Sequence, residues 1–146
     1  MSNIKHNDFK CAYRIETRKV ADSAYPYGGN SLRNRAEVAK FMRCIEDSDQ
    51  EKLVTLYLDT RRHLVGVSVY LGDSTGAMLS PRDLVKCAIL LNVSNVILVH
   101  NHPSGVTVPS SHDIMFKNSC QRAFELFGIT LDDCLIISQG GQYESF

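Results

Sequence analysis

The chain has 146 residues, of which 44% are hydrophobic and 22% charged, and its 16 Lys and Arg balance its 16 Asp and Glu. This length indicates one domain with a substantial hydrophobic core. Zero net charge does not support nucleic-acid binding, which depends on Lys and Arg neutralising phosphates, although it leaves room for a local basic patch.

Cysteine usage and hydropathy indicate the compartment. The five cysteines are scattered, odd in number and contain no C-x-x-C, so we expect reduced thiols rather than a disulfide framework or a cysteine zinc site. The segment MSNIKHNDFK has no apolar core of a signal peptide, and no apolar run approaches the ~20 residues of a membrane span. We therefore expect a cytoplasmic protein that does not contact a membrane.

The first regular pattern follows a stretch of poor periodicity. Residues 1–30 contain the turn signal YPYGGN and are predicted to be an N-terminal extension of a domain that covers residues 31–146. A helix is expected from Ser31, because small and apolar residues recur there at helical spacing. These residues are Ala36, Ala39, Met42 and Ile45. The polar segment EDSDQ ends this helix.

A hairpin and a second helix come next. Leu53–Leu58 and Leu64–Leu71 are rich in β-branched and aromatic residues, and the compact DTRRH between them predicts a β-hairpin. A loop, GDSTGAM, follows. Ser80 then suits the N-cap of a helix that ends at Asn92, with Asp83 completing a capping box.

The second half of the chain predicts a strand, a helix and two more strands. NVILV, residues 95–99, is a continuous apolar run and predicts a strand buried on both faces. The next helix runs from about Ser110 to Phe127, with Gly128 as its stop. Its expected inner face comprises Phe116, Cys120, Ala123, Phe124 and Phe127. CLIIS predicts a strand and GGQYESF a final edge segment, so the order indicates a single α/β or α+β sheet domain.

Two histidines directly follow the apolar strand. Side chains alternate along an extended segment, so His100 and His102 point the same way and can hold one metal ion. A zinc or iron site needs a third ligand, and the nearest downstream candidates are His112 and Asp113. Asp113 lies in the first turn of a helix, and His112 is expected to point away from it. Two histidines and one aspartate leave an open fourth position, typical of catalytic zinc, at which water has a pKa near ~7.

Each of these residues also has a simpler interpretation. Ser110 and Asp113 form S-x-x-D, which is an ordinary helix N-cap, and His102 before Pro103 suits a surface turn. The combination favours a metal site, because H-x-H ends a buried strand, a Pro/Gly loop follows, and S-x-x-D opens a helix. A general base would have to come from elsewhere in the chain, and the Ser110 hydroxyl is within reach of the same cavity.

The pattern H-x-H, seven residues, S-x-x-D resembles the JAB/MPN (JAMM) zinc metalloproteases. The longer segments LYLDTRRHLV and SPRDLVKCAILLNVSNVILVHNHPSG resemble the RadC branch of that superfamily, over roughly residues 31–146. The resemblance implies a cytidine deaminase-like α/β sandwich, with a curved mixed β-sheet packed between helices. It also implies one Zn²⁺ held by His100, His102 and Asp113, and a catalytic glutamate at Glu51.

The residues alone do not single out Glu51, because Glu46 and Asp49 lie nearby. Glu51 is equally well interpreted as a solvent-exposed residue at the start of a strand, without a catalytic role. Two positions depart from the RadC pattern. Val106 stands where many members carry an acidic residue, and Asp133 replaces the histidine of a Leu-Asp-His pattern that would support the metal ligands. Residues 1–30 are too few for the helix-hairpin-helix region of longer members, so no DNA role of that region is carried over.

The resemblance implies a zinc-dependent hydrolase that cleaves a peptide or isopeptide bond in a protein or peptide substrate. Glu51 would activate water with the zinc and pass a proton to the leaving amine, and Ser110 would help to hold the oxyanion. One alternative is a non-catalytic protein-interaction module, which the complete motif disfavours. Another is a DNA-repair-associated factor, although a nuclease usually gathers carboxylates around Mg²⁺ and has a basic groove. The arginines expected to be solvated or capping residues are Arg61, Arg62 and Arg82.

Overall fold

A computed structural model describes residues 31–72 and 79–146. The predicted extension with its YPYGGN turn, and most of the GDSTGAM loop, lie outside the described residues. The helices are α1 (Arg35–Phe41), α2 (Pro81–Leu91) and α3 (Ser111–Glu125), with short 3₁₀ turns η1 (Met42–Ile45) and η2 (Gln139–Gly141). The strands are β1 (Lys52–Leu58), β2 (Leu64–Leu71), β3 (Asn95–Asn101), β4 (Thr130–Ser138) and β5 (Gln142–Ser145).

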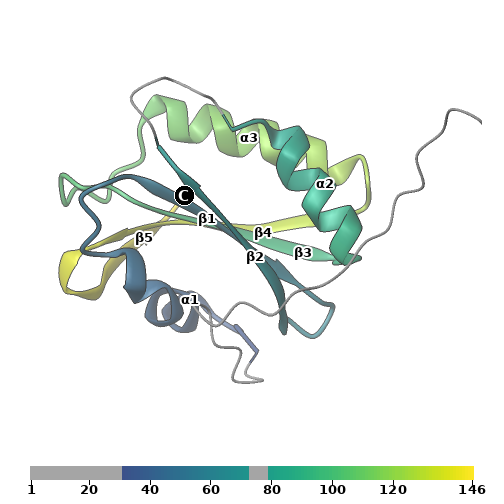
Figure 1. The fold of residues 1–146 in the computed structure, drawn as a ribbon, viewed down its shortest axis with the longest axis horizontal. Coiled ribbons are helices and arrows are strands. Elements are labelled where there is room, and N and C mark those ends of the chain that lie inside the picture. The colour runs from purple at the N-terminus through teal and green to yellow at the C-terminus, as the bar shows by residue number, and fades with distance from the viewer. Residues whose placement is uncertain (1–30, 73–78) are drawn as a thin grey trace, which may run out of the picture.

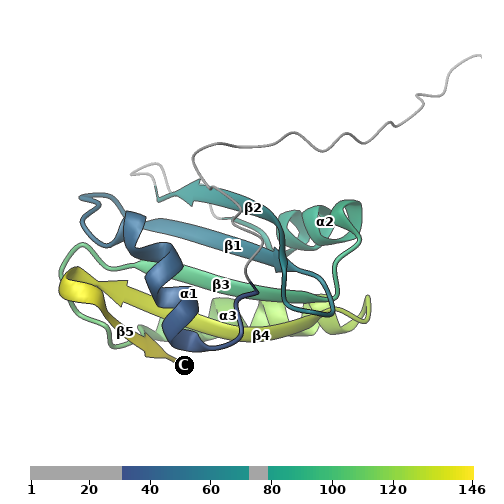
Figure 2. The ribbon, with the colours of Figure 1, turned by 90° about the horizontal axis from the view of Figure 1, so that it is seen from below.

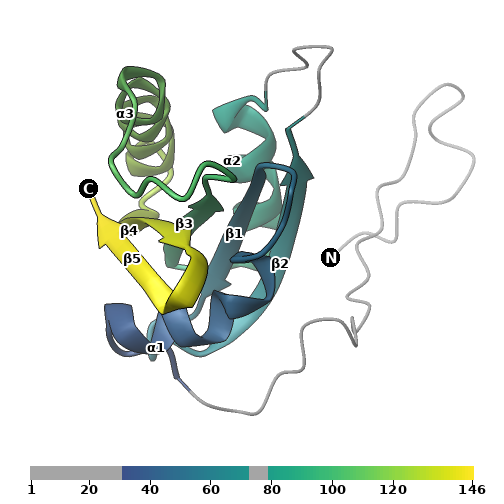
Figure 3. The same ribbon diagram turned by 90° about the vertical axis from the view of Figure 1, so that its left-hand side faces the viewer.

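The five strands form one mixed sheet in the order β2-β1-β3-β4-β5 (Figure 2). Only β3 and β4 are parallel, and α3 connects them; the other pairs are antiparallel. Helices α2 and α3 cover one face of the sheet and α1 covers the other (Figures 1 and 3). The predicted α/β sandwich, a mixed sheet packed between helices, is therefore confirmed.

Both faces of the central strands are buried, which explains the apolar run in β3. The face toward α1 packs Val54, Leu56, Leu58, Ile97, Val99, Leu135 and Ile137. The face toward α2 and α3 packs Tyr57, Val96, Leu98 and Cys134 with Leu84, Ala88, Cys120 and Phe124. Because side chains alternate along a strand, the even-numbered positions of β3 face α2 and α3. His100, which is also an even-numbered residue of β3, therefore lies on the face toward α2 and α3.

Helix α1 begins at Arg35, four residues later than the periodicity predicted. Ser31 instead forms an isolated antiparallel bridge with His63, and Asn34 caps the helix. Ala36 is exposed, whereas Ala39, Met42 and Ile45 of the same predicted spacing are buried. Val38 and Ala39 are the buried residues of α1.

The termini of α2 follow the predicted chemistry with one difference. The Ser80 hydroxyl accepts a hydrogen bond from Arg82 N at 3.2 Å, and Asn92 ends the helix in the left-handed conformation, with φ 53°. The predicted capping box is wrong for these residues, since Asp83 gives no side-chain bond back to the Ser80 backbone. Asp83 instead lines a cavity described below.

Helix α3 has 15 residues and ends at Glu125, so the predicted end at Phe127 is two residues too late. Phe127 is 59% exposed, and its predicted place on the inner face is wrong, because the chain leaves the helical path before it. Cys120 and Phe124 are fully buried as predicted, and Gly128 turns the chain with φ +66°. In the described part of the chain, no helix has the length and apolar character needed to cross a membrane.

The DTRRH turn between β1 and β2 is confirmed, but Arg62 is neither solvated nor a capping residue. It has φ 64°, and its Nε donates to the Leu32 carbonyl at 2.7 Å. Its Nη1 lies 2.5 Å from Asp132 Oδ2. Arg62 therefore ties the hairpin turn to the segment before α1 and to β4, whereas Arg61 is exposed as expected.

Candidate metal centre

The end of β3 brings the two histidine rings together, as the alternation predicted. His100 is the sixth residue of β3 and His102 follows the strand; their Nε2 atoms lie 3.0 Å apart. His100 is only 6% exposed, and its ring meets Phe146 edge-on at 6.0 Å between centroids. Burial lowers the pKa of His100 to about 4, so its ring is neutral at pH 7 and has a nitrogen lone pair to offer a metal.

The loop after β3 orients His102 through its second ring nitrogen. Gly105, with φ +80°, closes a turn by donating from its N–H to the His102 carbonyl at 2.9 Å. Ser138 of β4 donates to the Gly105 carbonyl at 2.9 Å and anchors that turn. His102 Nδ1 lies 2.8 Å from the Val106 carbonyl, which can only accept, so Nδ1 is the donor. In a neutral ring this leaves Nε2 as the free ligand atom, an arrangement typical of metal-binding histidines.

Asp113 enters the centre from the first turn of α3. Its Oδ1 lies 3.4 Å from His100 Nε2, and its Oδ2 lies 3.4 Å from His102 Nε2. Burial by itself raises the pKa of Asp113, but hydrogen bonds from the Ser110 backbone and hydroxyl, together with the two histidines, outweigh it. The net pKa of Asp113 is lowered, so the carboxylate is ionised at neutral pH.

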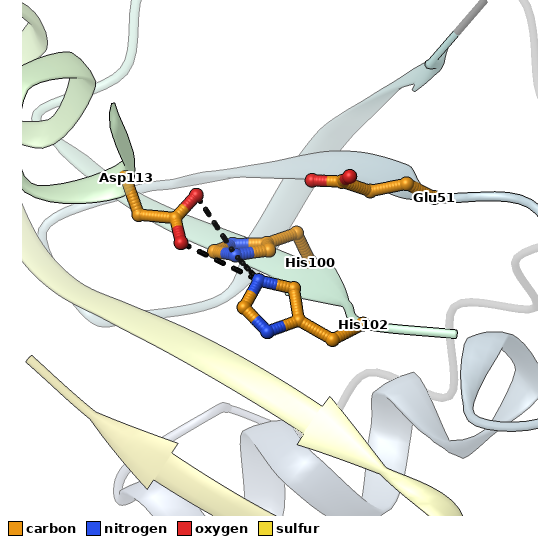
Figure 4. A group of neighbouring side chains, drawn as sticks. All are labelled: Glu51, His100, His102 and Asp113. Carbon is orange, nitrogen blue, oxygen red and sulfur yellow. Dashed lines mark hydrogen bonds and ion pairs between the residues drawn. The ribbon is translucent and has the colours of Figure 1, made fainter. Parts of the chain in front are cut away.

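Glu51 reaches the centre because of the register between β1 and β3. These strands are antiparallel with Leu53 opposite His100, and extending this register by two residues sets Glu51 opposite His102. One ligand atom from each of Glu51, His100, His102 and Asp113 lies within 4.8 Å of the others. Figure 4 shows the Glu51 carboxylate directed toward the other three side chains. The structure thus assembles all four residues that the sequence analysis proposed for the metal and the general base.

The other candidates lie apart from this group. His112 lines the neighbouring cavity but is not one of the four clustered residues. Glu46 is engaged elsewhere, since its carboxylate accepts a hydrogen bond from Gly141 N at 3.0 Å. Asp49 is exposed and also lies outside the group.

The donor set fits a first-row transition metal. Two neutral imidazole nitrogens and one ionised carboxylate are the ligand types that zinc and non-haem iron sites use. A fourth group, the exposed Glu51, stands beside them without a protein partner for its carboxylate among the described residues. The cluster can therefore bind one metal ion, and the Nδ1 bond of His102 to the Val106 carbonyl leaves its Nε2 for ligation.

Comparison with known proteins identifies the family of the chain. The model of the RadC-like JAB domain matches residues 32–146, which covers the whole described fold except Ser31. The chain belongs to the RadC-like JAB family. A UPF0758 protein of Aquifex aeolicus (strain VF5) is 36% identical over 117 residues, which are 80% of this chain and 50% of that protein. A UPF0758 protein of Streptococcus thermophilus (strain ATCC BAA-491 / LMD-9) is 34% identical over 134 residues, 90% of this chain and 56% of that protein. This RadC-like JAB chain thus spans about half the length of these curated relatives.

The two departures from the RadC pattern do not disturb the geometry of the centre. Val106 acts through its backbone carbonyl, and its side chain is 52% exposed. Asp133 lies on the α1 face of the sheet, where it pairs with Arg35 at 2.6 Å and accepts from the Ser145 hydroxyl. The expected loss of a residue that supports the ligands is therefore not seen, because position 133 lies across the sheet from the metal centre.

Asn101 is a site residue that sequence analysis missed. It is fully buried between the two histidines in sequence, and its Oδ1 accepts from Lys52 N at 2.8 Å. Its Nδ2 lies 3.1 Å from the Gln50 carbonyl and 3.3 Å from the Ser48 carbonyl, and donates to both. These bonds bracket Glu51 and hold its backbone against β3. The available signal was the polar residue at the strand position that faces away from the histidines.

Replacing Asn101 with alanine is expected to lower the free energy of unfolding by about 1–3 kcal/mol, because buried backbone groups near Lys52 lose their partner. Urea denaturation of both proteins measures this. Asn118→Ala is the matched control, since Asn118 is exposed on α3 and its loss should be close to neutral. Equal losses in the two variants would remove Asn101 from the support of the centre.

A cavity of about 530 Å³ opens beside the centre. Glu51, His100 and Asp113 line one part of it, and the rest is mostly apolar. Cys134 also lines it, but burial raises the pKa of that thiol to about 12. The thiol therefore stays protonated at neutral pH, which disfavours Cys134 as a nucleophile. A cavity of this size, with a mostly apolar lining and a few polar groups, suits a small part of a substrate.

Proposed function

We propose that this RadC-like JAB domain is a zinc-dependent hydrolase that cleaves a peptide or isopeptide bond in a protein or peptide substrate. The observation that carries the proposal is the clustering of ligand atoms of Glu51, His100, His102 and Asp113 within 4.8 Å of one another, beside a cavity that three of these residues line. The family and the metal-binding group fit a metallohydrolase. That the metal is zinc and that the cleaved bond is an amide are both proposed.

The residues have separate roles in this proposal. His100, His102 and Asp113 would hold the ion, which supplies a Lewis acid that polarises a carbonyl and acidifies water. Glu51 is exposed at the start of β1, so its carboxylate can accept a proton from the attacking water. The same carboxyl group then delivers that proton to the nitrogen of the leaving amine.

Ser110 supports Asp113 in a way that a lone N-cap does not. The Ser110 hydroxyl accepts from Asp113 N at 3.1 Å and the Ser110 N–H donates to Asp113 Oδ2 at 2.7 Å, which together form the capping box of α3. The Ser110 hydroxyl also donates to Asp113 Oδ2 at 2.7 Å. These bonds aim the carboxylate at the histidines. The additional role of Ser110 in holding the oxyanion stays a prediction, because the hydroxyl is engaged with Asp113 in this structure.

Ser110→Ala is expected to lower stability by about 1 kcal/mol through the lost cap. The same change should slow hydrolysis by up to ~10²–10³-fold if the hydroxyl also stabilises the oxyanion. Melting temperature and cleavage rate are measured on the same preparations. Ser80→Ala is the matched control, since the Ser80 hydroxyl caps α2 through Arg82 N alone. Equal cleavage rates for the two variants would leave Ser110 as a structural cap.

The test of the function is a peptide-library cleavage assay with purified, zinc-loaded full chain, with metal content measured on the same sample. New amino termini that appear with zinc and disappear with a chelator are the expected result. Stoichiometric zinc without cleavage of any linear or branched peptide would contradict the proposal and favour a binding role for the domain.

A further inference from the structure

The cavity beside the metal centre has a distinct chemical division. Its apolar lining comes from strands, a helix and the segments that flank α2 and β5, namely Leu53, Tyr70, Leu79, Leu98, Phe116 and Phe146. Its charged groups are Glu51 and Asp113 at the metal centre, with Asp83 at the first turn of α2. Lys117 is the one lysine among the described residues that line the cavity. It adds a positive charge to a lining whose other side chains are mostly apolar or acidic.

Lys117 lies one helical turn after Asp113, and residues four apart on a helix share a face, with Cβ atoms about 5–6 Å apart. Its Nζ lies 5.5 Å from the centroid of the Phe146 ring. Phe146 in turn packs edge-on against His100. The ammonium group is therefore held over an aromatic face beside the metal centre, and it is only partly exposed.

The described residues give Lys117 no carboxylate within ion-pair distance. Lys117 Nζ lies 5.5 Å from the Phe146 ring centroid, which in turn lies 6.0 Å from the His100 ring centroid. Because an extended peptide advances about 3.3 Å per residue, a group bound at Lys117 belongs within about three residues of a bond held at the metal centre. The apolar walls between the two places would receive the intervening side chain. A carboxylate is the group that an ammonium donor binds with charge-assisted hydrogen bonds.

We propose that Lys117 determines specificity by binding a substrate carboxylate next to an apolar side chain that occupies the cavity. The inference rests on the proposed peptide hydrolysis for its substrate class. The carboxylate comes either from the C-terminus of a peptide or from an acidic side chain one residue beyond the apolar one. Lys117 acts on binding, and the proton transfers stay with Glu51.

The test is isothermal titration calorimetry of the zinc-loaded full chain carrying Glu51→Gln. This substitution allows the affinity of each probe to be measured without turnover. Three probes are compared: acetyl-Ala-Ala-Leu with a free carboxylate, the same peptide as its amide, and acetyl-Ala-Leu-Glu as its amide. At least one acidic probe should bind about tenfold or more tightly than the neutral peptide, as expected for a charged hydrogen bond. A preference for the first acidic probe assigns the C-terminal carboxylate, and a preference for the second assigns a side chain.

Adding Lys117→Gln should remove this preference, whereas Lys117→Arg should retain it. Lys86→Gln is the matched control, because Lys86 is exposed on α2 and lies outside this cavity. The inference is overturned if no probe binds, if the neutral peptide binds as well as both acidic ones, or if the preference survives Lys117→Gln. It is also overturned if a chelator abolishes the preference, since the carboxylate would then be bound to the metal.

The two proposals fail separately. If the preference depends on Lys117 but the wild-type chain cleaves no peptide, recognition stands and the hydrolase assignment fails. If library peptides are cleaved without any dependence on Lys117, the hydrolase assignment stands and this specificity role fails.

Discussion

Glu51→Gln is expected to retain the metal and to lose hydrolysis. The amide keeps the size of the side chain but cannot accept and return a proton, and a general acid–base residue contributes about 10²–10⁴ in rate. His100, His102 and Asp113 still offer two nitrogens and a carboxylate, so metal content should match wild type. Cleavage of a library-selected peptide and elemental analysis of the same sample measure the two properties.

Two neighbouring carboxylates provide controls for this result. Glu46→Gln and Asp49→Asn should leave the rate near that of wild type, because neither residue belongs to the four-residue group. Glu46 also has its own structural contact with Gly141 N. Undiminished cleavage by Glu51→Gln would remove Glu51 from the chemistry and make Glu46 and Asp49 the next candidates.

Asp113→Ala is expected to lose both the metal and the activity. The Nε2 atoms of the remaining two histidines lie 3.0 Å apart, and Glu51 is the one other member of the group of potential metal ligands found among the described residues. Metal affinity should fall by more than the ~10–100-fold typical of losing an outer hydrogen-bond partner, because a direct ligand is removed. Competition with a zinc-sensitive dye gives the affinity, and the cleavage assay gives the rate.

His112→Ala is the matched control for Asp113→Ala. Both residues lie in the first turn of α3 and line the cavity, but only Asp113 approaches the histidine nitrogens. The control should keep the metal. Loss of metal from His112→Ala together with retention by Asp113→Ala would exchange the two assignments. A circular-dichroism spectrum of each variant shows whether α3, whose capping box includes Asp113, stays folded.

The sequence alone determined most of the secondary structure and, within the metal centre, the histidine pair and the helix start that holds Asp113. Alternation along an extended chain is a local property, so it correctly turned His100 and His102 to one side. Helix caps are also local, which is why Ser80, Asn92 and Ser110 were placed correctly. The errors at Ser31 and Phe127 occurred at helix ends, where periodicity does not reveal that the chain pairs with another strand or leaves the helix.

Contacts between distant segments were decided only by the tertiary structure. Nothing near Glu51 distinguishes it from Glu46; the antiparallel register of β1 with β3 does, because it sets position 51 opposite His102. The roles of Asn101 and Lys117 depend on tertiary structure in the same way. Asn101 bonds the chain around the start of β1, and Lys117 lines a cavity to which β1, β2, β3, β4, α2 and α3 all contribute. A periodic pattern reports which side of its own element a residue occupies. The partner on that side depends on strand order and register, which residues far apart in the chain establish together.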